Sequence, residues 1–354
     1  MVSLSTKLFS GAVLFVAILV GLTRAPWQEF QQVQGEIAMI DFMEQQYEKY
    51  AKQNPLPPVV QYKARDGSGL AIRLYEPPLF DKFDKNGTSI ENCKFPNVIL
   101  HHGSALDGAS FHPLATKLQQ FGMAVYVPDI RGHGGSIPSG EGDLDYMWQN
   151  LDDLEDLLLY FDLDPSCTFI VGHSAQGGGL WHMASQKKWR NKFAGFVPVA
   201  AMMGLHPEFI RGTAASNFVS VNLARIISIS ILNTMGITWF NHQQTTRFFK
   251  KIGVKGVDDY HNHCTYNLGI SHGPMFALDY KTIVAYVPEG TRVLSISAGS
   301  DEALADLTPV LQPLSTHLEH ATLSGATHMG ILFEEKLANK INDFVGKASA
   351  AAAL

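Results

Sequence analysis

One serine lies where an apolar run meets a turn rich in small residues, which is the position of many nucleophiles. The segment Val171-Gly172-His173-Ser174-Ala175-Gln176-Gly177 follows the apolar residues 168–170. A serine that ends a strand and begins a helix sits on a sharp turn, so its hydroxyl projects above the sheet. The helix N-terminus also favours negative charge that develops beside the serine. The segment predicts that Ser174 is a nucleophile; the alternative is a glycine-rich turn that happens to contain serine.

Two residues further along the chain have the types that a nucleophilic serine requires. A serine hydroxyl needs a base, and the base needs an acid that orients it. Asp301 follows the strand-like run Val293–Ile296, and His328 lies in a loop after a second such run at 318–323. Because the carboxyl ends of parallel strands meet at one edge of a sheet, we expect Ser174, Asp301 and His328 to form a triad. Glu302 is the alternative acid.

A third strand end supplies candidate donors for an oxyanion. His101-His102-Gly103-Ser104 follows the strand-like residues 97–100. We expect the backbone N–H groups of Ser104 and Ala175 to form the oxyanion hole. His261, His263 and Cys264 are close in sequence but lack a fourth ligand in a matching motif. We therefore expect neither a metal nor a cofactor.

Strands and helices alternate along most of the chain. Such alternation with apolar strands predicts an α/β fold, with a mostly parallel sheet covered by helices on both faces. The alternation stops between about Met203 and Pro288, where the sequence is rich in Ile, Leu, Phe and Trp. We therefore expect a core at 56–202 and 289–348, and an inserted helical cap at 203–288.

The ordered motifs together resemble the α/β-hydrolase superfamily. They are His102-Gly103, Pro128-Asp129-Ile130-Arg131-Gly132-His133-Gly134, Gly172-His173-Ser174, Asp301 and His328. The sequence looks most like the lysophospholipase and monoacylglycerol-lipase-like branch, which is related in pattern to the S33 serine aminopeptidases, and the resemblance covers roughly residues 60–345. It implies the α/β-hydrolase fold with an inserted cap. Gln176 departs from the family pattern, which has a small residue there, and we expect its side chain to crowd the turn.

The N-terminal residues suggest a location outside the cytoplasm. Lys7 precedes an uncharged, apolar stretch at 8–23, and Arg24 closes it. This pattern predicts a signal-anchor or signal peptide at 1–25, with a single membrane span or secretion and an extracytoplasmic or lumenal domain. The residues 26–55 predict an amphipathic linker helix. A disulfide between Cys93 and Cys264 is possible in such a compartment.

The composition narrows the class of partner. The chain is 46% hydrophobic and 17% charged, which excludes global disorder, and its net charge of −6 argues against nucleic acid. The resemblance implies a serine hydrolase that cleaves carboxylic esters through an acyl-enzyme. The apolar cap and the membrane segment favour a lipid-like ester, such as a lysophospholipid or a monoacylglycerol. A peptidase or thioesterase of the same fold, or a non-catalytic scaffold, is the alternative.

Overall fold

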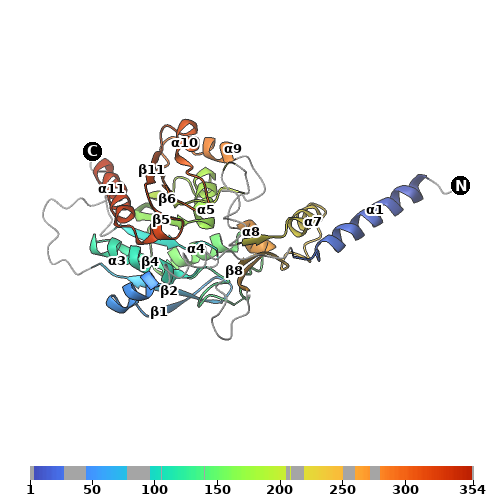
Figure 1. The fold of residues 1–354 in the computed structure, drawn as a ribbon, viewed down its shortest axis with the longest axis horizontal. Helices are drawn as coiled ribbons and strands as arrows, with labels where there is room; N and C mark the ends of the chain where they lie inside the picture. The colour runs from blue at the N-terminus through green and yellow to red at the C-terminus, as the bar shows by residue number, and fades with distance from the viewer. Residues whose placement is uncertain are drawn as a thin grey trace.

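An eight-stranded sheet forms the centre of the structure (Figure 1). The computed structural model describes residues 4–27, 45–77, 96–104, 106–138, 140–204, 208, 219–249, 260–271 and 280–352. The strand order is β1-β2-β4-β3-β5-β6-β10-β11. Pairings of β1 with β2 and of β2 with β4 are antiparallel, and the others are parallel. The strands are β1 (Val59–Lys63), β2 (Gly69–Tyr75), β3 (Asn97–His101), β4 (Ala124–Pro128), β5 (Thr168–His173), β6 (Gly195–Val199), β10 (Leu294–Ala298) and β11 (Glu319–Leu323).

The central strands are buried on both faces, as their sequences predict. Every residue of β5, β6 and β10 is buried. Neighbouring residues of β3 belong to different apolar clusters, because successive side chains of a strand point to opposite faces. Ile99 packs in one cluster, and Val98 and Leu100 pack in the other. The predicted α/β fold with a covered, mostly parallel sheet is confirmed.

Helices cover both faces of this sheet. The cluster around Val98 includes residues of α3 (His112–Gln120) and α11 (Glu335–Ala352). The cluster around Ile99 includes residues of α4 (Gln149–Tyr160), α5 (Ala175–Ser185) and α9 (Tyr280–Ala285). The shorter helices are η1 (Gly108–Phe111), η2 (Pro165–Cys167), α10 (Thr308–Leu311), η3 (Gln312–Leu314) and η4 (Gly330–Phe333).

The inserted region adds a small sheet to the helices that the sequence predicts there. The region contains α7 (Leu223–Thr234) and α8 (Tyr266–Ser271). It also contains an antiparallel sheet of β7 (Val219–Val221), β8 (Gln244–Phe249) and β9 (Tyr260–Thr265). Thr265 N–H donates to the Gly142 carbonyl at 2.9 Å, and Trp148 N–H donates to Ser271 Oγ at 2.6 Å. These bonds fix the cap to the core.

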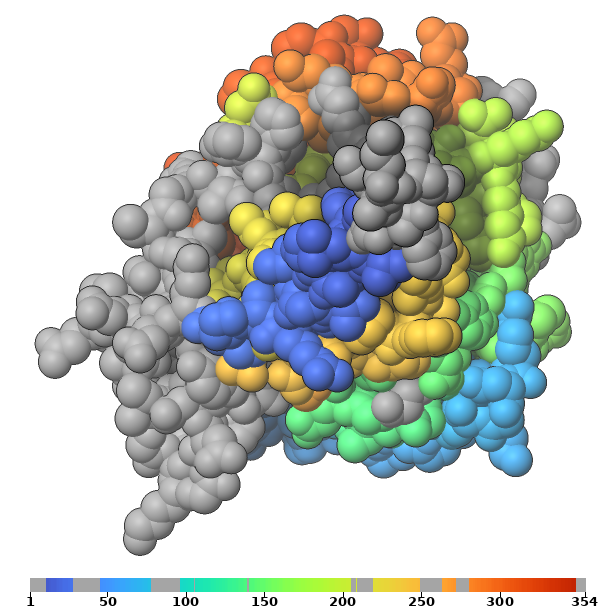
Figure 2. Space-filling model, turned by 90° about the vertical axis from the view of Figure 1, so that its right-hand side faces the viewer, coloured from blue at the N-terminus to red at the C-terminus, as the bar shows by residue number. Residues whose placement is uncertain are grey.

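The N-terminal helix projects from the body beside the cap (Figures 1 and 2). This helix, α1 (Leu4–Leu22), contacts α7 and buries Leu19, whereas Leu14 and Ile18 are more than half exposed. Within the described part of the chain, no helix is both long enough and apolar enough to cross a membrane. The membrane span predicted at 1–25 is therefore not supported.

The linker helix predicted at 26–55 falls partly outside the described residues. Residues 28–44 lie outside the described residues, and residues 45–53 are helical. This segment packs on α3, because the His112 ring lies 5.4 Å from the Tyr50 ring and its Nε2–H donates to the Asn54 carbonyl at 2.7 Å. The helical residues 45–53 and the turn after them thus pack on α3 of the core.

The cysteines differ from the pairing considered from sequence. Cys167, at the end of η2, is disulfide-bonded. Cys264 on β9 is a free, buried thiol. A Cys93–Cys264 disulfide is therefore not formed, and Cys93 itself lies outside the described residues.

A buried ion pair braces the loop after β4. The Arg131 side chain is 1% exposed, and it donates from Nε and Nη2 to both carboxylate oxygens of Asp153, at 2.9 and 2.7 Å. Nη1 lies 3.0 Å from Asp66 Oδ2. Replacing Arg131 by Met should lower the free energy of unfolding by about 3–5 kcal/mol, because Asp153 would stay buried without its partner.

Guanidinium unfolding monitored by circular dichroism measures this loss. Lys347→Met is the control, because it removes a cation from an exposed pair with Glu319, and such pairs contribute about 0–1 kcal/mol. Equal effects of the two substitutions would contradict the assigned role of Arg131.

Candidate active site

The three predicted triad residues are in hydrogen-bond contact. His328 Nε2 lies 3.0 Å from Ser174 Oγ, and His328 Nδ1 lies 2.8 Å from Asp301 Oδ2. Ser174 follows β5, Asp301 follows β10 and His328 follows β11, so all three sit at carboxyl ends of parallel strands. An imidazole between a hydroxyl and a carboxylate can accept the proton of that hydroxyl.

The surroundings of Asp301 and His328 determine which of the two side chains is ionised. Burial opposes ionisation of Asp301. The pKa of Asp301 is nevertheless lowered by the hydrogen bond with His328, by the positive charge of His328, and by bonds from the N–H groups of Leu304 and Ala303. Burial also disfavours a charged His328, yet the hydrogen bond with Asp301 and the charges of Asp301 and Glu302 raise the His328 pKa. Asp301 is therefore an ionised acceptor that orients the imidazole and stabilises its protonated form.

The turn at Ser174 has the strained geometry of a nucleophile elbow. Ser174 has φ 55° and ψ −117°, which is unusual for a residue other than glycine. A Cβ at Gly172 would lie 2.7 Å from the Gln176 carbonyl oxygen, and a Cβ at Gly177 would lie 2.9 Å from Ala201 Cα. Glycine is therefore required at these two positions, because the backbones of the strand, the helix and the loop after β6 meet there.

Gln176 takes part in this close approach through its backbone. Its carbonyl oxygen and carbon are the atoms nearest to a Cβ at Gly172, at 2.7 and 2.8 Å. The Gln176 side chain is buried and hydrogen-bonds with His101 at the end of β3. Burial lowers the pKa of His101 to about 4, so His101 is neutral and its contact with Gln176 is a bond between uncharged groups.

The loop after β3 lies directly against Ser174. A Cβ at Gly103 would lie 2.9 Å from Ser174 Cβ and 3.2 Å from His173 Nδ1. His102 holds this loop: its Nε2 accepts from the Ile130 N–H at 2.9 Å, and its Nδ1–H donates to the Gly103 carbonyl at 2.9 Å. The use of the Ser104 and Ala175 N–H groups as oxyanion donors stays a prediction.

Two residues beside the triad contact the main chain of the histidine, which sequence reasoning missed. Glu302 Oε2 accepts from the His328 N–H at 2.9 Å. His173 Nε2 lies 2.9 Å from the His328 carbonyl oxygen. Glu302, the alternative acid, thus binds the backbone of His328 while Asp301 binds its ring. The only sequence signal was position, since His173 precedes the serine and Glu302 follows the acid.

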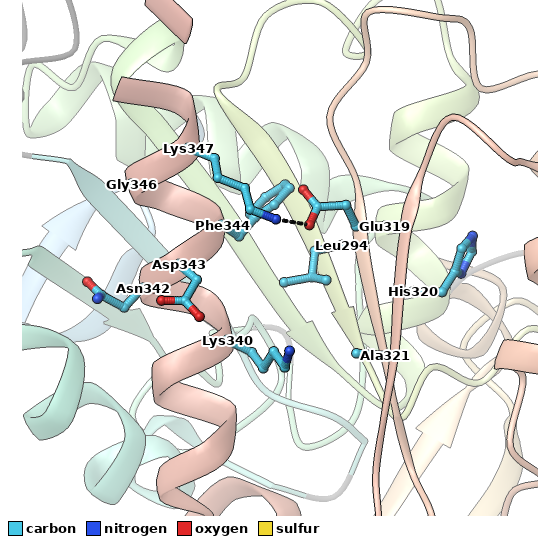
Figure 3. Close-up of a pocket in the computed structure, with 10 residues that line it drawn as sticks. All are labelled: Leu294, Glu319, His320, Ala321, Lys340, Asn342, Asp343, Phe344, Gly346 and Lys347. Carbon is cyan, nitrogen blue, oxygen red and sulfur yellow. Dashed lines mark hydrogen bonds and ion pairs between the residues drawn. The ribbon is translucent and has the colours of Figure 1, made fainter. Parts of the chain in front are cut away.

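A separate groove lies at the amino ends of β10 and β11, away from Ser174, Asp301 and His328. It has a volume of about 460 Å³ and lies between α11 and the first residues of β10 and β11, Leu294 and Glu319 (Figure 3). Lys347 of α11 pairs with Glu319 at its edge. Because the triad lies at the carboxyl ends of these strands, the groove lies at the opposite edge of the sheet and is not its substrate site.

No metal cluster accompanies the triad in the part of the chain that the structure describes. No group of three or more His, Cys, Asp or Glu side chains there could hold a metal ion. His263 is half-buried on β9 and Cys264 is buried beside it. The His261 side chain lies outside the described residues.

Comparison of sequences relates the chain to esterases. Residues 94–247 match the family described as serine aminopeptidase, S33, a range that includes Ser174 but not Asp301 or His328. A probable protein phosphatase methylesterase 1 of Caenorhabditis elegans is 30% identical over 156 residues, which cover 41% of this chain and 43% of that protein. A Candida albicans protein phosphatase methylesterase 1 is 29% identical over 34% of this chain and 32% of its own length. The chain spans less than half of each relative.

Solved structures share the fold over most of the chain. A soluble variant of a monoglyceride lipase from Saccharomyces cerevisiae superposes with a TM-score of 0.58 at 16% identity, covering 85% of this chain and 97% of that one. An X-ray structure of an aryl esterase from Burkholderia cenocepacia gives 0.52 at 15% identity, covering 83% and 100%. These likenesses show the fold alone. The family match and these structures together show that the chain has the α/β-hydrolase fold.

Proposed function

We propose that this protein is a serine hydrolase that cleaves carboxylic esters through an acyl-enzyme. The observation that carries the proposal is the chain of contacts from Ser174 Oγ through His328 to Asp301, at 3.0 and 2.8 Å. His328 accepts the serine proton as the hydroxyl attacks the ester carbonyl, and then passes it to the leaving alcohol. Water deacylates Ser174 with His328 as the base again. The N–H groups of Ser104 and Ala175 stabilise the oxyanion, at about 3 kcal/mol per donor.

Substitution of Ser174 tests the hydrolase proposal against a non-catalytic scaffold. Ser174→Ala should abolish ester hydrolysis and labelling by a fluorophosphonate probe, because both require the activated hydroxyl. Turnover of a p-nitrophenyl ester and in-gel labelling of the purified protein measure the two effects. Ser185→Ala is the matched control, since Ser185 ends α5 and bonds the His182 carbonyl of the same helix. Labelling retained in Ser174→Ala would contradict the assignment of Ser174 as the nucleophile. No labelling of the unaltered protein would favour a non-catalytic scaffold.

We propose a lipid-like ester as the substrate, and the apolar surface of the cap supports this choice. Ile226 and Ile229 form the cap's own core with Tyr266. Leu223 and Ile227 on the same helix are 50% and 57% exposed, and those apolar side chains are not needed for that core. A short-chain ester is the second candidate, because both curated relatives are named as methylesterases.

A series of p-nitrophenyl esters separates these two substrate classes. If the substrate is lipid-like, kcat/KM should rise from acetate to dodecanoate, since each buried methylene contributes about 0.8 kcal/mol. The measurement is initial rate against concentration below the aggregation limit of each ester. A maximum at acetate or butyrate would contradict the lipid-like ester and favour the short-chain one.

The charge state of His328 predicts the pH dependence of the reaction. The base must be neutral, and Asp301 and Glu302 favour its protonated form, so the His328 pKa is raised above 6.5. Activity should therefore be lost as the pH falls through this raised pKa. The acid limb of kcat/KM, measured between about pH 5 and 9, should have its midpoint above the ordinary histidine value of about 6.5. A midpoint below that value would contradict the assigned surroundings of His328.

A further inference from the structure

The main chain of His328 is held by side chains from two other segments. Its N–H donates to Glu302 Oε2 at 2.9 Å, and its carbonyl oxygen lies 2.9 Å from His173 Nε2. Within the described residues, neither group bonds to another backbone group. Regular secondary structure therefore does not fix this residue, and the two side chains occupy both of its peptide hydrogen-bonding groups.

The protonation of His173 makes its contact a true hydrogen bond. Burial first, and then the charge of His328, lower the pKa of His173 to about 3, so its ring carries a single proton. Because a carbonyl oxygen only accepts, that proton is on Nε2 and is donated to His328. The His173 ring is fully buried and lies 4.8 Å from the His328 ring. The residue before the nucleophile is thus bonded to the residue that carries the base.

We propose that Glu302 and His173 are positioning residues that hold the main chain of His328, and so place its imidazole between Ser174 and Asp301. This inference rests on the proposed hydrolase activity. Asp301 can orient the ring about its own axis, but it does not fix the backbone from which the ring extends. A misplacement of about 1 Å at a reacting group can lower a rate by about 100-fold, so such a tether has a measurable effect.

Two substitutions of Glu302 separate its hydrogen bond from its charge. Glu302→Gln keeps an oxygen that accepts the His328 N–H but removes the negative charge. Its kcat at the plateau should stay within about twofold, and its acid limb should move to lower pH. Glu302→Ala also removes the acceptor, so its kcat should fall by about 10- to 100-fold with little change in KM. In the described structure the titratable groups that face His328 are Asp301, Glu302 and His173.

The control for charge is Glu319→Gln. It makes the same chemical change on the first residue of β11, where Glu319 pairs with Lys347 at the surface. Its kcat and acid limb should match those of the unaltered protein. An equal displacement of the acid limb in Glu302→Gln and Glu319→Gln would overturn the local role of Glu302.

Two substitutions of His173, by Gln and by Leu, separate its N–H donor from its volume. In Gln, the N–H donor is the same number of bonds from Cβ as Nε2 is in His. His173→Gln should therefore keep most of the activity. His173→Leu keeps an apolar volume without a donor, and its kcat should fall by about 10- to 100-fold. Thermal unfolding of each variant shows whether it is folded. Equal activity of the Gln and Leu variants, or full activity of Glu302→Ala, would overturn the proposal.

A measurement without turnover separates this inference from the proposed function. The His328 pKa can be read from an NMR titration of its ring resonances, assigned by comparison with His328→Gln. It should be lower in Glu302→Gln than in the unaltered protein and the same in Glu319→Gln; an unchanged value in Glu302→Gln would overturn the contact. Absence of both ester turnover and fluorophosphonate labelling in the unaltered protein would instead refute the hydrolase itself.

Discussion

The close approach of backbones around Ser174 is the constraint on which the rest of the site depends. The serine has φ 55°, and glycines at 172, 177 and 103 leave no room for a Cβ. A turn of this kind persists only where the surrounding structure holds it. Here β5 lies between β3 and β6 in the sheet, the Ser174 N–H donates to the Val199 carbonyl at 3.0 Å, and the Ser174 carbonyl accepts from Met202 at 2.9 Å. The end of β6 and the loop after it thus hold the backbone of Ser174.

His328 is positioned differently from Ser174. His328 lies in a loop between β11 and η4, outside any ladder of backbone bonds. Its ring is held by Asp301, whose other carboxylate oxygen accepts two N–H groups, from Ala303 and Leu304 at 2.9 and 2.7 Å. The acid therefore has its own fixed orientation before it contacts the imidazole. Side-chain contacts thus fix the position of His328, whereas strand pairing fixes the position of Ser174.

Much of the fold and of the candidate site follows from local sequence patterns. The core strands are short apolar runs between turn residues, so their positions could be predicted to within a residue or two. Ser174, Asp301 and His328 could be found because each follows such a run. The three strands of the cap could not be predicted in this way. One of them, β8, has the sequence Gln-Thr-Thr-Arg-Phe-Phe, in which apolar and polar residues do not alternate. The end of the chain is divided into two helices, because Glu334 adopts ψ 121° and separates η4 from α11.

The errors arise where distant parts of the chain meet. The Gln176 side chain was expected to crowd the elbow, but it is buried and hydrogen-bonds with His101 at the end of β3. Sequence spacing does not show which distant residue a side chain meets. The contacts of Glu302 and His173 with the main chain of His328 join residues that are 26 and 155 positions apart. Periodicity carries no signal at such separations.

The proposed hydrolase activity depends on covalent acylation of Ser174. The most direct measurement is mass spectrometry of peptides from protein quenched in acid during turnover of a p-nitrophenyl ester. We expect the mass of the acyl group on the peptide that contains Ser174, and accumulation of this adduct when deacylation is slowed at low pH. Turnover with no adduct, or with the adduct on another residue, would contradict the account.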